Sequence, residues 1–106
     1  MSDDFNRDPA SAIERAEAAI LRLIHEIIPD ARLHRIGPID FTSRCWSCWV
    51  VTRTDEERRR LQTDRDLLNR LGEAAARAGA RPDGFTFQSQ ETVDREYGGS
   101  WFYAMR

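Results

Sequence analysis

Residues 43–53, SRCWSCWVVTR, carry the clearest structural pattern in the sequence. It contains both cysteines, two of the three tryptophans and the strongest strand pattern in the chain. Side chains alternate across a strand, so two sets are expected on opposite faces: Trp46, Cys48 and Val50 on one, and Cys45, Trp49 and Val51 on the other. A strand that is apolar on both faces is typical of the centre of a sheet. The pattern does not decide which of the two tryptophans is exposed.

The totals predict one globular domain. The chain has 106 residues, a net charge of −2 and an apolar share of 41%, which fit a single domain with its own core. All of its basic side chains are arginine, so no lysine is available as a general base or for a Schiff base. The acidic balance makes nucleic-acid binding unlikely. Because no signal peptide or membrane-length apolar run is evident, we expect a cytoplasmic protein without membrane contact.

Apolar residues at three- and four-residue steps predict a first helix from residue 9 to Ile28, ended by Pro29. Residues 1–8 are expected to form a flexible N-terminal arm, and residues 9–106 a single α+β domain. The segment 31–42 alternates and is interrupted at Gly37-Pro38, which predicts an edge strand with a bulge. The connection to 43–53 is too short for a crossover, so these two strands are expected to be antiparallel.

A second helix is expected over residues 55–79. Two capping-box patterns, at Thr54 and at Thr63, allow either one helix or two with a break near Gln62. The segment from Phe85 to Tyr97 is expected to be a strand, and Gly98-Gly99 a hairpin turn into a last strand over 100–105. The second half of the chain therefore predicts one more helix, or a broken one, and a further β-hairpin.

The predicted order is α-β-β-α-β-β. It corresponds to an α+β fold in which two helices pack on one face of a four-stranded, mainly antiparallel sheet. The order resembles a circular permutation of the ferredoxin-like βαββαβ layout, and this analogy implies no function.

The most visible candidate for chemistry is the C-x-x-C formed by Cys45 and Cys48, a spacing used by redox dithiols and by zinc sites. His25 and His34 would have to complete a metal site. An extended strand sends the two sulfurs to opposite faces, so we expect no metal, no redox role and no cofactor. No arrangement of a nucleophile with a base is evident, and we expect the protein not to be an enzyme.

Two groups of charged residues are further candidates for chemistry. Asp94 and Glu96 would share one face of the expected strand, where paired carboxylates can perform acid–base chemistry. The run at residues 58–60 is three arginines directly after three acidic residues, which favours pairing along one helix turn. Both groups are interpreted as solvated surface.

The aromatic residues are more informative. Two helices cover only one face of a sheet, so the other face would expose one tryptophan of 43–53 and, depending on the register of the last strand, Trp101 and Tyr103. Such a patch indicates an interface, unless Phe5, the N-terminal arm or the curl of the sheet covers it. The expected partner-binding residues are Trp46, Trp49, Tyr97, Trp101, Tyr103, Arg44, Arg53 and Arg106.

The sequence therefore favours a non-enzymatic protein-binding module that uses an aromatic sheet face. It would act as a homodimer, or as a small inhibitor or immunity-type protein that docks on another protein. The alternative is a small-molecule-binding or catalytic domain with a pocket between the sheet and the second helix. RNA binding on stacked aromatic residues is a weaker third possibility.

Overall fold

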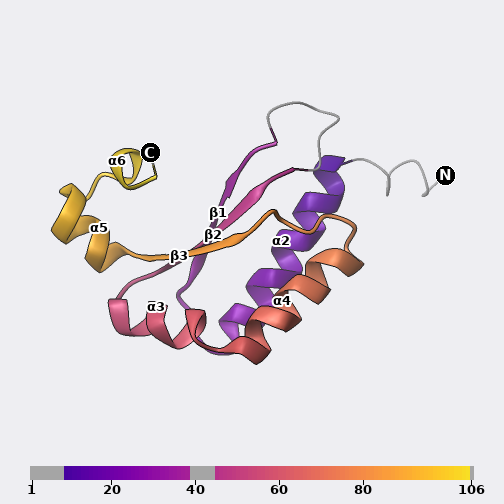
Figure 1. The fold of residues 1–106 in the computed structure, drawn as a ribbon, viewed down its shortest axis with the longest axis horizontal. Coiled ribbons are helices and arrows are strands. Elements are labelled where there is room, and N and C mark those ends of the chain that lie inside the picture. The colour runs from indigo at the N-terminus through magenta and orange to yellow at the C-terminus, as the bar shows by residue number, and fades with distance from the viewer. Residues whose placement is uncertain (1–8, 39–44, 106) are drawn as a thin grey trace.

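The computed structural model describes residues 9–38 and 45–105 of the chain. The elements in chain order are α2 (Pro9–His25), β1 (Arg32–Ile36), β2 (Ser47–Thr52), α3 (Asp55–Gln62), α4 (Arg65–Arg77), β3 (Phe85–Ser89), α5 (Gln90–Tyr97) and α6 (Trp101–Ala104). Figure 1 shows α2 and α4 on one side of the sheet and α5 and α6 on the other. The predicted N-terminal arm and its Phe5 lie outside the described residues.

The sheet has three strands in the order β1-β2-β3. β1 pairs antiparallel with β2, as the short connection predicts, while β3 pairs parallel with β2. The chain reaches β3 through α3 and α4, and a crossover of this kind brings a strand back in the parallel direction. β2 is therefore the central strand, which agrees with the two-sided apolar pattern of residues 43–53.

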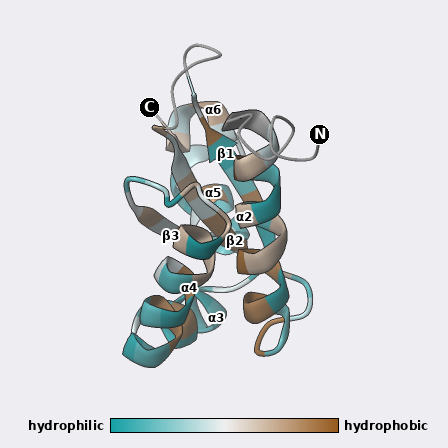
Figure 2. Cartoon of the chain, turned by 90° about the vertical axis from the view of Figure 1, so that its right-hand side faces the viewer, coloured by the Kyte–Doolittle hydropathy of each residue, from teal (hydrophilic) through white to brown (hydrophobic). Residues whose placement is uncertain are grey.

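One face of the sheet is covered by α2 and α4. Cys48 and Val50 of β2 are fully buried there, and they join Ile20 of α2 and Leu71 of α4 in one core cluster. Trp46 is the largest residue of this cluster at 1% exposure, and its Nε1 donates a hydrogen bond of 2.9 Å to the carbonyl oxygen of Ala80. Figure 2 shows brown and teal bands alternating along these helices, as expected of helices with one apolar face.

The predicted second helix is two helices. Thr54 forms the capping box that begins α3, with its hydroxyl accepting from the backbone N–H of Glu57. The carboxylate of Asp64 then accepts from the backbone N–H of Leu67 at 3.0 Å and begins α4. Asp64 interrupts the apolar stripe because it is an N-cap, so the break near Gln62 is the arrangement that forms.

The prediction of a four-stranded, mainly antiparallel sheet with two helices is wrong, as is the permuted ferredoxin-like layout derived from it. The described residues form five helices and a three-stranded mixed sheet. Ser89 caps α5 by accepting from the N–H of Thr92, and Ser100 caps α6 by accepting from the N–H of Tyr103. Gly98 has a φ of 59° and ends α5 as a left-handed C-cap. The glycine pair that suggested a hairpin is thus a helix stop.

The second face of the sheet is partly covered by these C-terminal helices. Val51 of β2 points away from the main core, yet it is only 1% exposed, and Val93 of α5 is fully buried. α5 therefore closes one end of a face that the sequence predicted to be bare. None of the helices in the described ranges is long and apolar enough to cross a membrane.

Candidate functional site

The candidate site begins on the face of the sheet opposite α2 and α4. His34 of β1 is in register with Trp49 of β2, and Trp49 is in register with Thr86 of β3. Residues paired in this way lie side by side on one face of a sheet. Trp49 is half-buried, so of the two tryptophans in residues 43–53, Trp46 belongs to the core and Trp49 to the second face.

Trp101 holds α6 against this face. Its ring stacks on His34 with centroids 5.5 Å apart and an interplanar angle of 27°. Its Nε1 donates a hydrogen bond of 2.9 Å to Oε1 of Gln90, at the start of α5. Trp101 therefore joins β1, α5 and α6, and its ring is largely engaged by the protein itself.

The side chains next to Trp101 are turned to solvent. Phe102 is 69% exposed and Tyr103 is 58% exposed, and their rings meet edge to face at 5.3 Å. Tyr97 and Ile36 are the other large apolar side chains that are exposed in the described part of the chain. We call this set the aromatic surface; its members are His34, Ile36, Trp49, Tyr97, Trp101, Phe102 and Tyr103.

A polar cluster fixes α5, and with it the aromatic surface, to the rest of the protein. The carboxylate of Asp55, at the start of α3, accepts hydrogen bonds from the hydroxyls of Ser89 and Thr92. Its Oδ2 also lies 3.2 Å from Nη1 of Arg95. In return, the backbone N–H of Asp55 donates to Oε1 of Glu91 at 2.9 Å. We call these residues the Asp55 cluster.

The electrostatics of the Asp55 cluster favour the ionised carboxylate. The hydrogen bonds from Ser89 and Thr92, followed by the charge of Arg95, hold the pKa of Asp55 well below its usual range. Arg58 approaches from the other side, with Nη2 3.8 Å from Oδ1 of Asp55 and Nη1 donating to Gln88 at 3.1 Å. The Nε of Arg58 is buried without a hydrogen-bond partner.

The Asp55 cluster is arranged for structure and not for catalysis. Ser89 is fully buried and Thr92 is 4% exposed, so a substrate cannot reach either hydroxyl. Both hydroxyls are already committed to the carboxylate of Asp55. Ser89 and Thr92 are buried, whereas the side chains of Asp55 and Arg95 are 16% and 56% exposed. A paired hydrogen-bond network rigidifies the elements it joins, here α3, the end of β3 and α5.

The cysteines lie in different environments. Cys45 is exposed, whereas Cys48 is buried in the core. Burial, with a smaller contribution from the charge of Glu17, raises the pKa of the Cys48 thiol to about 12, so this thiol stays protonated and unreactive. His25 lies with Nε2 2.8 Å from the carbonyl oxygen of Ala31. Among the described residues, no three metal-binding side chains come together.

The residues predicted to bind a partner do not all lie in one place. Trp49, Tyr97, Trp101 and Tyr103 belong to the aromatic surface, and Trp46 is in the core. Arg53 is exposed and pairs with Asp30 at 3.2 Å. Arg44 and Arg106 lie outside the described residues.

Sequence reasoning missed several members of the site. Phe102 was not among the expected partner-binding residues, yet it is the most exposed of the large apolar side chains described. Asp94 was expected on a strand with Glu96, but it lies in α5 and accepts from Nε2 of Gln90 at 2.9 Å. The sequence feature that could have indicated α5 and α6 is a pair of serines, Ser89 and Ser100, each of which is the N-cap of a short helix.

Comparison of the chain with protein-family models, curated proteins and solved structures finds no match.

Proposed function

We propose that this chain is a non-enzymatic protein-binding module whose contact site is the aromatic surface. The observation that carries the proposal is the distribution of exposed apolar side chains. All four large ones in the described ranges, Ile36, Tyr97, Phe102 and Tyr103, lie on α5, on α6, or at the end of the strand that carries His34. Exposed apolar side chains gathered in one region mark interaction sites, whereas scattered ones do not.

The kind of side chain supports an interface with a protein. Tyrosine, tryptophan and phenylalanine are enriched at interfaces because they bury a large area with few rotatable bonds. Trp101 is held by Gln90 and His34, which leaves Phe102 and Tyr103 presented on a fixed base. A surface that is ordered before binding loses less conformational entropy when the partner docks.

A second copy of the chain is the simplest partner. The strand beside the aromatic surface exposes the basic Arg32, whereas α5 exposes the acidic Glu91 and Glu96. In a two-fold dimer, a contact between the basic patch of one copy and the acidic patch of the other occurs twice. The complementary charges of the two patches favour this arrangement. Docking of the same surface on a different protein, as an inhibitor or immunity-type protein would do, is the other outcome of the test.

The catalytic or small-molecule alternative has no comparable observation in its favour. The groove beside the second predicted helix lies on α4 and is lined by Leu68, Asn69, Gly72, Glu73, Ala76 and Arg81. Asp94 and Glu96, the carboxylates expected to supply polarity in this alternative, are on α5 and do not line it.

The test is the oligomeric state of three proteins, measured by sedimentation velocity over a wide range of concentration. The wild type is expected to dimerise, and Phe102→Ala to weaken the dimer by about tenfold or more. The control is Ala18→Ser, an exposed position on α2 on the other side of the sheet, and it should dimerise as the wild type does.

A wild type that stays monomeric at every concentration would overturn the second-copy proposal. Equal weakening by Phe102→Ala and by the control would instead show that the dimer forms elsewhere. Trp101→Ala is a less clean variant, because it also removes the stack on His34 and the hydrogen bond to Gln90.

A further inference from the structure

The second feature that lacks a partner is the outer edge of β3. Among the described residues, β3 pairs with β2 alone and is therefore an edge strand. The carbonyl oxygen of Gly84 accepts from the N–H of Cys48 at 3.1 Å, so every second residue from Gly84 points its backbone groups toward β2. The N–H and C=O groups of Phe85 and Phe87 consequently point outward. Within the described part of the chain, no hydrogen bond reaches them.

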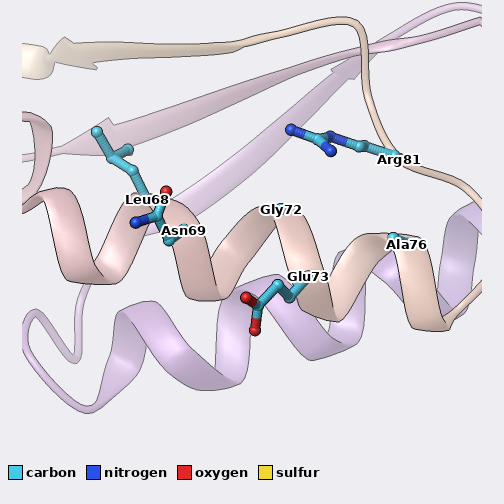
Figure 3. Close-up of a pocket in the computed structure, with 6 residues that line it drawn as sticks. All are labelled: Leu68, Asn69, Gly72, Glu73, Ala76 and Arg81. Atoms are coloured by element: carbon cyan, nitrogen blue, oxygen red, sulfur yellow. The ribbon is translucent and has the colours of Figure 1, made fainter.

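A groove runs along α4, between this helix and the segment that leads into β3. Leu68, Gly72 and Ala76 follow one another at single helix turns along it, and the groove has a volume of about 330 Å³. Figure 3 shows Leu68 and Arg81 reaching into the space between α4 and the chain that leads into β3. The guanidinium of Arg81 lies over Gly72, where an added Cβ would meet its Nη2 at 3.4 Å. The volume suits one apolar side chain of a ligand with space around it.

Arg81 supplies the charge of the groove. It is exposed, and in the described ranges it makes no ion pair or hydrogen bond. Glu73 lines the same groove, but Figure 3 shows its carboxylate pointing to the opposite side of α4. A planar guanidinium with unused donors matches a carboxylate in two parallel hydrogen bonds.

We propose that the β3 edge and the α4 groove together bind an extended acidic peptide segment of another protein. The segment adds as a fourth strand, with its backbone paired to Phe85 and Phe87. One apolar side chain enters the groove beside Leu68, and a carboxylate meets the guanidinium of Arg81 over Gly72. Strand addition beside a helix obtains affinity from the main chain and specificity from the groove.

A foreign segment fits this site better than a second copy does. The β3 strand is Phe-Thr-Phe-Gln-Ser and contains no acidic residue, so pairing two β3 strands leaves Arg81 without a carboxylate within the added strand. An exposed edge is a site where other chains pair unless the protein blocks it, and neither a proline nor a charged side chain interrupts β3. The inference is independent of the aromatic surface.

The probe for the test is a displayed library of random short peptides with free C-termini, selected on the wild-type protein. Counter-selection uses Gly72→Leu/Arg81→Glu, which fills the floor and reverses the charge. We expect wild-type-specific peptides with an apolar residue and a carboxylate in a common spacing. In fluorescence anisotropy, Arg81→Glu should weaken a selected peptide by about tenfold or more.

Three controls make the result decisive. Arg81→Gln covers the case in which the double variant misfolds, and circular dichroism checks the fold of each variant. A version of the peptide with alternate N-methyl groups should not bind, because it cannot form the ladder hydrogen bonds. Phe102→Ala should bind the peptide as the wild type does, which separates this site from the aromatic surface.

The inference is overturned if no peptide is enriched over the counter-selected variant, or if the N-methylated peptide binds equally well. It is also overturned if cross-links between cysteines introduced in β3 show that two copies pair through this edge. In that case the edge is an interface between copies and not a peptide site.

Discussion

The two faces of the sheet are held in different ways. On the face covered by α2 and α4, the contacts are apolar, and Trp46 and Ile20 are almost completely buried. On the other face Val51 and Val93 are also buried, but fewer apolar side chains are involved. There α5 and α6 are held in addition by polar contacts: the Asp55 carboxylate with two hydroxyls and Arg95, and the Trp101 indole with Gln90. The first face depends on buried area, and the second adds hydrogen-bond geometry to a smaller buried contact.

This difference indicates how stability and binding are separated in the chain. Apolar burial is non-directional and accounts for most of the folding free energy. Hydrogen bonds contribute less net free energy, but they fix orientation. The face that presents Phe102 and Tyr103 is therefore placed accurately without being essential to the core. Perturbations of the two faces should consequently give different kinds of effect.

The largest effect is expected in the core. Trp46→Ala removes the largest buried side chain and the hydrogen bond to Ala80, and we expect it to lower the free energy of unfolding by about 3–5 kcal/mol. Urea unfolding followed by circular dichroism measures this. The matched control, Trp46→Phe, keeps most of the apolar volume and should be clearly less destabilised. A loss below about 1 kcal/mol for Trp46→Ala would contradict the description of this face.

On the second face, Asp55→Ala should loosen α5 and α6 while the core stays folded. The change leaves the hydroxyls of Ser89 and Thr92 and the guanidinium of Arg95 without their shared acceptor. Amide hydrogen exchange should become faster by about tenfold or more in α5 and α6 and remain unchanged in α2 and α4. If exchange accelerates equally in both regions, the two faces are one cooperative unit and the comparison fails.

The pH dependence of stability tests the same carboxylate. The folded-state pKa of Asp55 is lowered, so its contribution to stability is fully present above the unfolded pKa of about 3.9. This contribution decreases as the pH falls below that value toward the folded-state pKa. The difference in unfolding free energy between wild type and Asp55→Asn should therefore be constant near neutral pH and shrink in acid. A difference that persists unchanged in acid would show that the ionised carboxylate is not the source.

The two regions also differ in how far the sequence predicts them. The pattern of residues 43–53 predicts β2 correctly because burial on two sides demands apolar residues at consecutive positions, and few other structures do. The C-terminal region was predicted wrongly because its helices are short. Over eight residues, α5 has too few turns to display a helical period, and Gly98-Gly99 is compatible with either a hairpin or a helix stop.

The sequence predicted an aromatic contact surface, but it did not predict all of the residues that form that surface. Aromatic residues near the C-terminus indicated a surface, whereas the strand assumption put Phe102 and Tyr103 on opposite faces of the sheet. The contacts that support the surface join Asp55 to Ser89 and Thr92 across more than thirty positions. No local pattern reports such a pairing, because it depends on β3 running parallel to β2.

A smaller effect is expected at Gly72, on the helical face. Gly72 lies inside α4, and an added Cβ would meet only the flexible end of Arg81, at 3.4 Å. Alanine restricts the unfolded chain and favours the helix, so Gly72→Ala should raise the free energy of unfolding by about 0.5–1 kcal/mol. Thermal unfolding measures the change. A loss of stability would show that the groove floor is more tightly packed than Gly72 and Arg81 indicate.

The smallest effect on stability is expected at Phe102, where folding and binding can be separated most clearly. Phe102 is 69% exposed, so Phe102→Ala should change the free energy of unfolding of the isolated chain by less than about 0.5 kcal/mol. Urea unfolding must be measured at concentrations where the protein is monomeric, because a dimer adds its association free energy to the apparent stability. A loss above about 1 kcal/mol under these conditions would mean that Phe102 helps to fold the chain. In that case weaker association of the variant would report damage to α6, and Phe102 would no longer identify the aromatic surface as a contact site.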